Sequence, residues 1–185
     1  MWWFYTVILG MSFGQILGEL ASAVRRWAQS PDRSGRPFLP GILWQVFLLV
    51  LVVEVWLAVT YYRTTFVEIS VLELLAFLLV PAGILVMSYL LPGAKEGDER
   101  DSFNRVRPVF FGTLIGIVAV NLLHDFLIGQ QGLDADLFFQ CLIVAGAVVG
   151  LFVRGTRADI ALAVAMTAVL GAYIGSEYST VLVST

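Results

Sequence analysis

The sequence predicts an all-α integral membrane protein, a bundle of six transmembrane helices in a single domain that covers residues 1–185. Two observations carry this prediction. Hydrophobic residues make up 59% of the chain and charged residues 14%, against about half and about a quarter in an average soluble domain. The apolar residues also gather in runs of about twenty, the length at which a helix crosses the hydrocarbon core of a bilayer.

The six runs lie at about 3–24, 41–62, 70–91, 109–128, 137–153 and 159–177. Helix-start signals accompany most of them. Pro40 and Pro108 can each occupy the first position of a helix, where the missing N–H costs nothing. Ser70 and Glu73 form a capping box, and residues 156–159 form a similar cap. We therefore expect separate helices that begin at these signals.

A polar segment divides the chain into two halves of three helices each. Residues 92–107 are rich in glycine and in charged side chains, so we expect a flexible cytoplasmic loop there. Pro81 lies midway along the third run and should kink its helix, because proline cannot donate the backbone hydrogen bond.

The basic residues predict how the bundle is oriented. Four Lys and Arg lie in the first loop, four in the third and two in the fifth, whereas only Arg63 lies in the second. Short loops rich in Lys and Arg stay in the cytoplasm. Both termini are therefore expected outside.

Small residues predict where helices pack closely. Lipid tails are as apolar as leucine, so membrane helices associate where small side chains let their backbones approach. The candidate packing positions are Gly10, Gly14, Gly18, Gly112, Gly116, Gly146 and Gly150. Together with an alanine stripe in the sixth run, they predict a tight centre of the first, fourth, fifth and sixth helices, with the other two peripheral.

Glu54 is the leading candidate for a functional site, because it lies near the middle of the second run. An ionised carboxylate at that depth is costly, so the side chain must be protonated, paired or facing water. One interpretation is a proton or cation site. The other is a neutral acid that hydrogen-bonds to a tyrosine, an asparagine or a backbone carbonyl.

Three further residues complete the candidate proton or cation site: Glu19, Asn121 and His124. Glu19 lies near the inner end of the first run, where a salt bridge to a cytoplasmic arginine is the simpler interpretation. Asn121 and His124 share a helix face near the outer end of the fourth run. They could relay protons to Glu54, or His124 could ligate a pigment or haem, but an interfacial histidine is the more ordinary interpretation.

Composition excludes several other classes. The only cysteine is Cys141, so no disulfide can form within the chain, and one histidine cannot build a multi-histidine metal site. We expect no metal and no cofactor. A net charge of −3 argues against a nucleic-acid partner. No nucleophile, base and orienting group occur together, so we expect no enzyme.

The first half of the chain also resembles a known family. The pattern consists of Gly-Gln-Ile-Leu-Gly-Glu-Leu-Ala at 14–21, a basic loop, the stretch from Trp44 to Trp56, Phe-Leu-Leu-Val-Pro at 77–81 and Leu-Leu-Pro-Gly at 90–93. It is similar to a family of uncharacterised six-helix bacterial inner-membrane proteins. The resemblance implies the same topology and a bacterial origin, and it implies no activity.

Two functions remain open at this point. The first is a non-catalytic subunit or scaffold that packs against lipid, against itself or against another membrane protein. The alternative is a small oligomeric channel or transporter for protons or cations that uses Glu54. The shortage of polar residues in the six runs favours the first.

Overall fold

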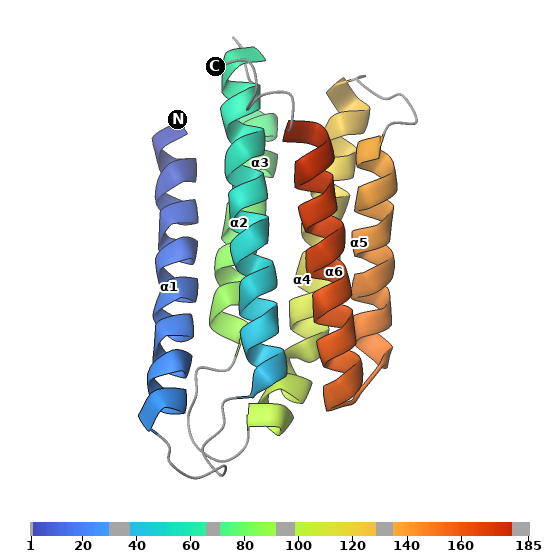
Figure 1. The fold of residues 1–185 in the computed structure, drawn as a ribbon. Coiled ribbons are helices and arrows are strands. Elements are labelled where there is room, and N and C mark those ends of the chain that lie inside the picture. Colours follow the sequence, from blue (N-terminus) through green and yellow to red (C-terminus); the bar gives the residue numbers. More distant parts are fainter. Residues whose placement is uncertain (1, 30–37, 66–70, 92–98, 129–134, 179–185) are drawn as a thin grey trace.

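The computed structural model describes residues 2–29, 38–65, 71–91, 99–128 and 135–178. Its described part is all-helical, with no strand, so the predicted fold class is confirmed at that level. The six helices are α1 (Trp2–Gln29), α2 (Leu39–Thr65), α3 (Val71–Leu90), α4 (Glu99–Ile128), α5 (Ala135–Phe152) and α6 (Thr156–Tyr178). They run alternately down and up a single bundle (Figure 1).

Four of the helices are long and apolar enough to cross a membrane. These are α1, α2, α4 and α6. The apolar parts of the other two helices are shorter, covering Leu74–Leu90 in α3 and Asp136–Phe152 in α5. The C-terminal ends of α1, α3 and α5 meet the N-terminal ends of α2, α4 and α6 at one end of the bundle, the lower end in Figure 1.

The predicted packing order of the helices is wrong. α1 packs against α2 and α3 at one edge of the bundle (Figure 1), whereas α2 contacts α1, α3 and α6. The reason is visible on α1, whose buried face carries Tyr5, Leu9, Ser12 and Ile16 instead of the glycines. Large side chains bury more area and make more dispersion contacts than glycine does, so they decide which face turns inward.

The start of α4 also differs from the prediction. The helix begins at Glu99, and Pro108 lies inside it instead of opening it. Residues 99–107 are therefore helical and not part of a flexible loop, while 92–98 lie outside the described residues. The extension is amphipathic, with Phe103 and Arg107 buried and Arg105 exposed. This packing offsets the one backbone hydrogen bond that a proline removes from a helix.

An aromatic cluster fills the lower half of the bundle. Its members are Trp44, Phe47, Phe103, Phe110 and Phe111, all fully buried. The Trp44 ring lies 5.1 Å from that of Phe111 and 5.5 Å from that of Phe110, in edge-to-face geometry. Such pairs contribute about 0.5–1.5 kcal/mol each beyond area burial, so the rings link α2 to α4 through side-chain contacts.

The glycines divide into two groups. Gly10, Gly14, Gly18, Gly112 and Gly116 have no neighbouring atom within 4 Å of where a Cβ would lie. They make no close contact within the described bundle, so the expectation of a tight contact at each of them inside the chain is wrong.

The remaining two glycines of the predicted set do have close neighbours. A Cβ at Gly146 would lie 2.9 Å from Sδ of Met166, and a Cβ at Gly150 would overlap the ring of Phe111. Gly83, which the sequence did not single out, is equally close to Ile117, at 2.7 Å from its Cδ1. Close approach therefore occurs between α5 and α6, between α5 and α4, and between α3 and α4.

Replacing Gly150 by alanine should destabilise the bundle. The added Cβ would push α5 away from the Phe111 ring, and overpacking of this kind costs about 1–3 kcal/mol. Thermal unfolding in detergent measures the loss. Gly116→Ala on α4 is the matched control, since its Cβ would enter open space. Equal melting temperatures for the two variants would contradict the assigned contact.

Candidate functional site

A polar cavity of about 100 Å³ lies in the upper half of the bundle. All six helices contribute to its wall, and its polar side chains are Tyr5, Glu54, Asn121, Asp136, Gln140 and Tyr173. The rest of the wall is aliphatic or aromatic. A single water molecule needs only about 10–15 Å³, so the cavity has room for several.

Glu54 reaches this cavity from the middle of α2. It makes no hydrogen bond or ion pair with any residue that the structure describes. On its own helix it is flanked in the wall by Leu51, Val55 and Ala58, none of which can replace lost hydration. A carboxyl group that faces an apolar-walled cavity without a partner is the chemical feature that distinguishes this site.

Asp136 is the second carboxyl group in the cavity. It is the second residue of α5, where the helix dipole favours a negative charge. Its Oδ2 also accepts a hydrogen bond of 2.8 Å from Nε2 of Gln140, one turn later. Asp136 is close enough to Glu54 for the two groups to repel each other when both are charged. The two carboxyl groups of the cavity therefore have different surroundings, because only Asp136 accepts a hydrogen bond from a described side chain.

Two pairs of aromatic rings also line the cavity. Tyr5 of α1 and Phe77 of α3 pack edge to face with 6.4 Å between ring centroids. Phe139 of α5 and Tyr173 of α6 lie 5.4 Å apart at a tilt of 50°. Rings from four helices therefore share the wall of the cavity with the two carboxyl groups.

The structure unites some of the predicted site residues and separates others. Glu54 and Asn121 share the cavity. Glu19 does not reach it and instead lies near the lower end of α1, where its Oε1 is 3.5 Å from Nε2 of Gln15. The side chain of His124 lies outside the described residues, so the suggested relay and ligand roles stay predictions.

Sequence reasoning missed Asp136 and Gln140. The fifth helix was expected to begin at residue 137, which left Asp136 in a loop. The available signal was the spacing of four between an acid and an amide at the start of an apolar run, which places both on one helix face. The distant contributions of Tyr5 and Tyr173 depend on the packing order of the helices, which the sequence did not predict.

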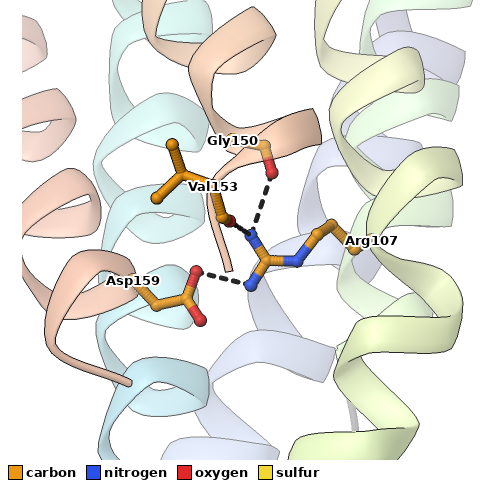
Figure 2. Close-up of polar contacts among 4 residues, drawn as sticks. All are labelled: Arg107, Gly150, Val153 and Asp159. Carbon is orange, nitrogen blue, oxygen red and sulfur yellow. Dashed lines mark hydrogen bonds and ion pairs between the residues drawn. The ribbon is translucent and has the colours of Figure 1, made fainter. Parts of the chain in front are cut away.

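A second polar arrangement lies at the lower end of the bundle, around Arg107. The side chain is 1% exposed and reaches from α4 to the end of α5 and the start of α6 (Figure 2). Its Nη1 donates to the carbonyl oxygens of Gly150, at 2.9 Å, and Val153, at 2.6 Å. Its Nη2 donates to Oδ1 of Asp159 at 2.5 Å.

Several effects stabilise the guanidinium in this position. The carbonyl groups at the C-terminal end of a helix carry partial negative charge, and Asp159 supplies a full one. The rings of Phe103 and Phe111 lie 4.9 Å and 5.9 Å from the guanidinium carbon, within cation–π range. Gly155, at φ +147°, makes the tight turn that brings the two helix ends together. The arrangement joins three helices, while the Nε atom of Arg107 is buried without a hydrogen-bond partner among the described residues.

Arg107 was predicted to lie in a cytoplasmic loop, and that prediction is wrong, because the residue is buried inside α4. Asp159 was predicted to belong to the cap of the sixth helix, and it lies in the first turn of α6, where it also pairs with Arg107. A single sequence gives no sign that the two pair, because they are separated by 52 residues. The basic bias of the lower end remains without Arg107, since Arg100, Arg105 and Arg157 are exposed there.

Asp159→Asn should destabilise the protein strongly. Asparagine keeps an acceptor oxygen but leaves the buried guanidinium charge uncompensated, which costs about 3–5 kcal/mol. The change should appear as a large drop in melting temperature in detergent. Asp101→Asn, at an exposed position of α4, is the matched control and should be nearly silent. Similar stabilities for both variants would show that the ion pair contributes little.

Comparison of the chain with models of protein families, with curated proteins and with solved structures finds no match in any of the three. Among the residues that the structure describes, no three His, Cys, Asp or Glu side chains converge as metal ligands would. The function must therefore be inferred from the polar cavity and the buried ion pair themselves.

Proposed function

We propose that the protein is a small transporter of protons or small cations, with Glu54 as the group that binds them. One observation carries this proposal: Glu54 faces a cavity of about 100 Å³ and has no partner among the described residues. Glu54 is half-buried and faces the cavity, so water or a bound cation in the cavity has to replace the hydration that its carboxyl group loses. Intramembrane acids in such cavities are characteristic of ion and proton pathways.

The aromatic cluster supplies the barrier that transport requires. Trp44, Phe47, Phe110 and Phe111 lie about one to two turns below the nearest cavity-lining residues of α2 and α4 and are fully buried. Their rings therefore occupy the interior of the bundle between the cavity and the lower end. In the proposed cycle, a substrate enters from the upper end, and a movement of the helices around this cluster opens the lower end.

The proposal includes the orientation in the membrane. All six helices would cross the inner membrane of a bacterium, with the upper end outside together with both termini. Exposed Arg25, Arg100, Arg105 and Arg157 gather at the lower end, which supports a cytoplasmic position for that end. Asp136 and the cavity would then lie on the outer side.

A second candidate is a subunit that packs against another membrane protein, against a second copy or against lipid. The exposed stripe of Gly10, Gly14 and Gly18 on α1 favours it, because none of the described helices covers these residues. Small residues spaced by four allow close approach of another membrane helix. Neither candidate involves a catalytic step.

Cysteine labelling tests the orientation. Cys141 is exposed and is first replaced by alanine, and single cysteines are then placed at Ala28 or Glu177, exposed near the ends of α1 and α6. In intact cells an impermeant maleimide should modify Glu177→Cys and should reach Ala28→Cys only after permeabilisation. The opposite pattern would reverse the orientation.

Proton flux in liposomes tests the function. The unmodified protein should dissipate an imposed pH gradient, followed with an enclosed pH-sensitive dye. Glu54→Gln should reduce the rate to that of protein-free liposomes, because glutamine keeps the shape and cannot ionise. Glu19→Gln, outside the cavity, is the control and should transport normally. No flux of protons or alkali cations under any imposed gradient would leave only the subunit candidate.

A further inference from the structure

We propose that the polar cavity binds a small alkylammonium ion, which exchanges for a proton on Glu54. This inference rests on the proposed function and names the substrate class of the same site. The inference follows from three features of the cavity wall. It contains two carboxyl groups in different environments, it contains two pairs of aromatic rings, and most of its other side chains are aliphatic.

The carboxyl groups define the charge that the cavity can accept. Asp136 has the hydrogen bond from Gln140 and the N-terminal end of α5 to stabilise its negative charge. Glu54 has neither, and two carboxylates in one apolar-walled cavity repel each other, so Glu54 carries a proton when the cavity is empty.

Binding then proceeds as an exchange. The Glu54 carboxylic acid releases its proton to water, and the ammonium group of R–NH₃⁺ takes a place between the Glu54 and Asp136 carboxylates. One positive charge enters and one leaves, so the net charge of the cavity is unchanged. A proton gradient across the membrane could accordingly drive the movement of the ammonium ion in the opposite direction.

The wall suits an organic cation better than a metal ion. A hard metal cation takes about six or more oxygen ligands to replace its hydration shell. Most residues of this wall offer only carbon, among them Leu51, Val55, Ile117, Ile143 and Leu170. An alkyl chain packs favourably against these side chains, while the charged nitrogen needs only the two carboxylates.

The aromatic pairs point to the same class of ligand. Tyr5 with Phe77, and Phe139 with Tyr173, place rings from four helices in the same cavity wall as the carboxyl groups. The faces of aromatic rings attract ammonium groups, and several rings around one site recognise alkylated ammonium ions. The volume of about 100 Å³ limits the ligand to a few carbon atoms.

Calorimetric titration of the full chain in detergent tests this inference, with ethylammonium chloride as the probe. Ethylammonium should bind, whereas sodium chloride at equal concentration and ethanol, the neutral analogue, should not. Glu54→Gln should abolish binding. Binding of sodium equal to that of ethylammonium would overturn the inference in favour of an unselective cation site.

Ring variants separate a cation–π contact from a structural effect. Phe139→Leu should weaken ethylammonium binding about fivefold, the effect of losing one cation–π contact of ordinary strength. Phe139→Tyr keeps the ring and should bind as the unmodified protein does. Phe138→Leu, at the neighbouring and exposed position of α5, is the control and should also bind normally. Equal binding by Phe139→Leu and Phe139→Tyr would contradict the role of the rings.

The flux assay distinguishes failure of this inference from failure of the proposed function. Proton flux that depends on Glu54 without ethylammonium binding would refute the alkylammonium site and leave a proton or cation transporter. Ethylammonium binding without any flux, even when ethylammonium is enclosed in the liposomes as the exchanging ion, would support the site and refute transport. Absence of both would refute both.

Discussion

A charge inside an apolar helix bundle is stable only when other groups replace its lost hydration. Arg107 meets this requirement through the carboxylate of Asp159, two carbonyl groups at the end of α5 and two aromatic rings. The geometry of the lower bundle depends on this ion pair, because it joins the start of α6 and the end of α5 to α4 (Figure 2). Glu54 faces the same physical requirement without any such partner among the described residues.

The contrast between these two residues divides the bundle into halves with different properties. Below the cavity, the aromatic cluster and the Arg107 ion pair leave little freedom, since interdigitated rings and charged hydrogen bonds resist displacement. Above the cluster, all six helices line the cavity, and its wall contains the carboxyl groups of Glu54 and Asp136. A rigid lower half beneath an adaptable polar site suits a protein that binds a small cation from one side and must prevent it from leaking across.

Much of the fold follows from the sequence. In an apolar surrounding, the backbone N–H and C=O groups of a long apolar run need hydrogen bonds within the run itself, and a helix provides them. The number of helices and their all-α class required nothing more. The ends of the helices were harder to predict. Pro108 was expected to begin the fourth helix, but burial of Phe103 and Arg107 extends α4 by about two turns before it. The packing order of the helices was the hardest to predict. On α1, either the face with the glycines or the face with Tyr5, Leu9 and Ile16 could turn inward, and only the tertiary structure shows that the second one does.

The candidate site was predictable only in part. The depth of Glu54 in an apolar run marked it, because acids are rare at that position for an energetic reason that a sequence reveals. Asn121 was noticed as well. Asp136, Gln140 and the aromatic pairs belong to other helices, and their convergence depends on long-range packing. The Arg107–Asp159 ion pair was not predicted for the same reason.

The central claim is that Glu54 is a protonated, unpartnered acid in the empty cavity. Infrared spectroscopy of the protein in lipid at neutral pH tests this most directly, because a protonated carboxyl group has a C=O absorption band that a carboxylate lacks. The unmodified protein should show this band, Glu54→Gln should lack it, and Glu19→Gln should retain it. Identical spectra for the unmodified protein and Glu54→Gln would contradict the claim and with it the proposed exchange.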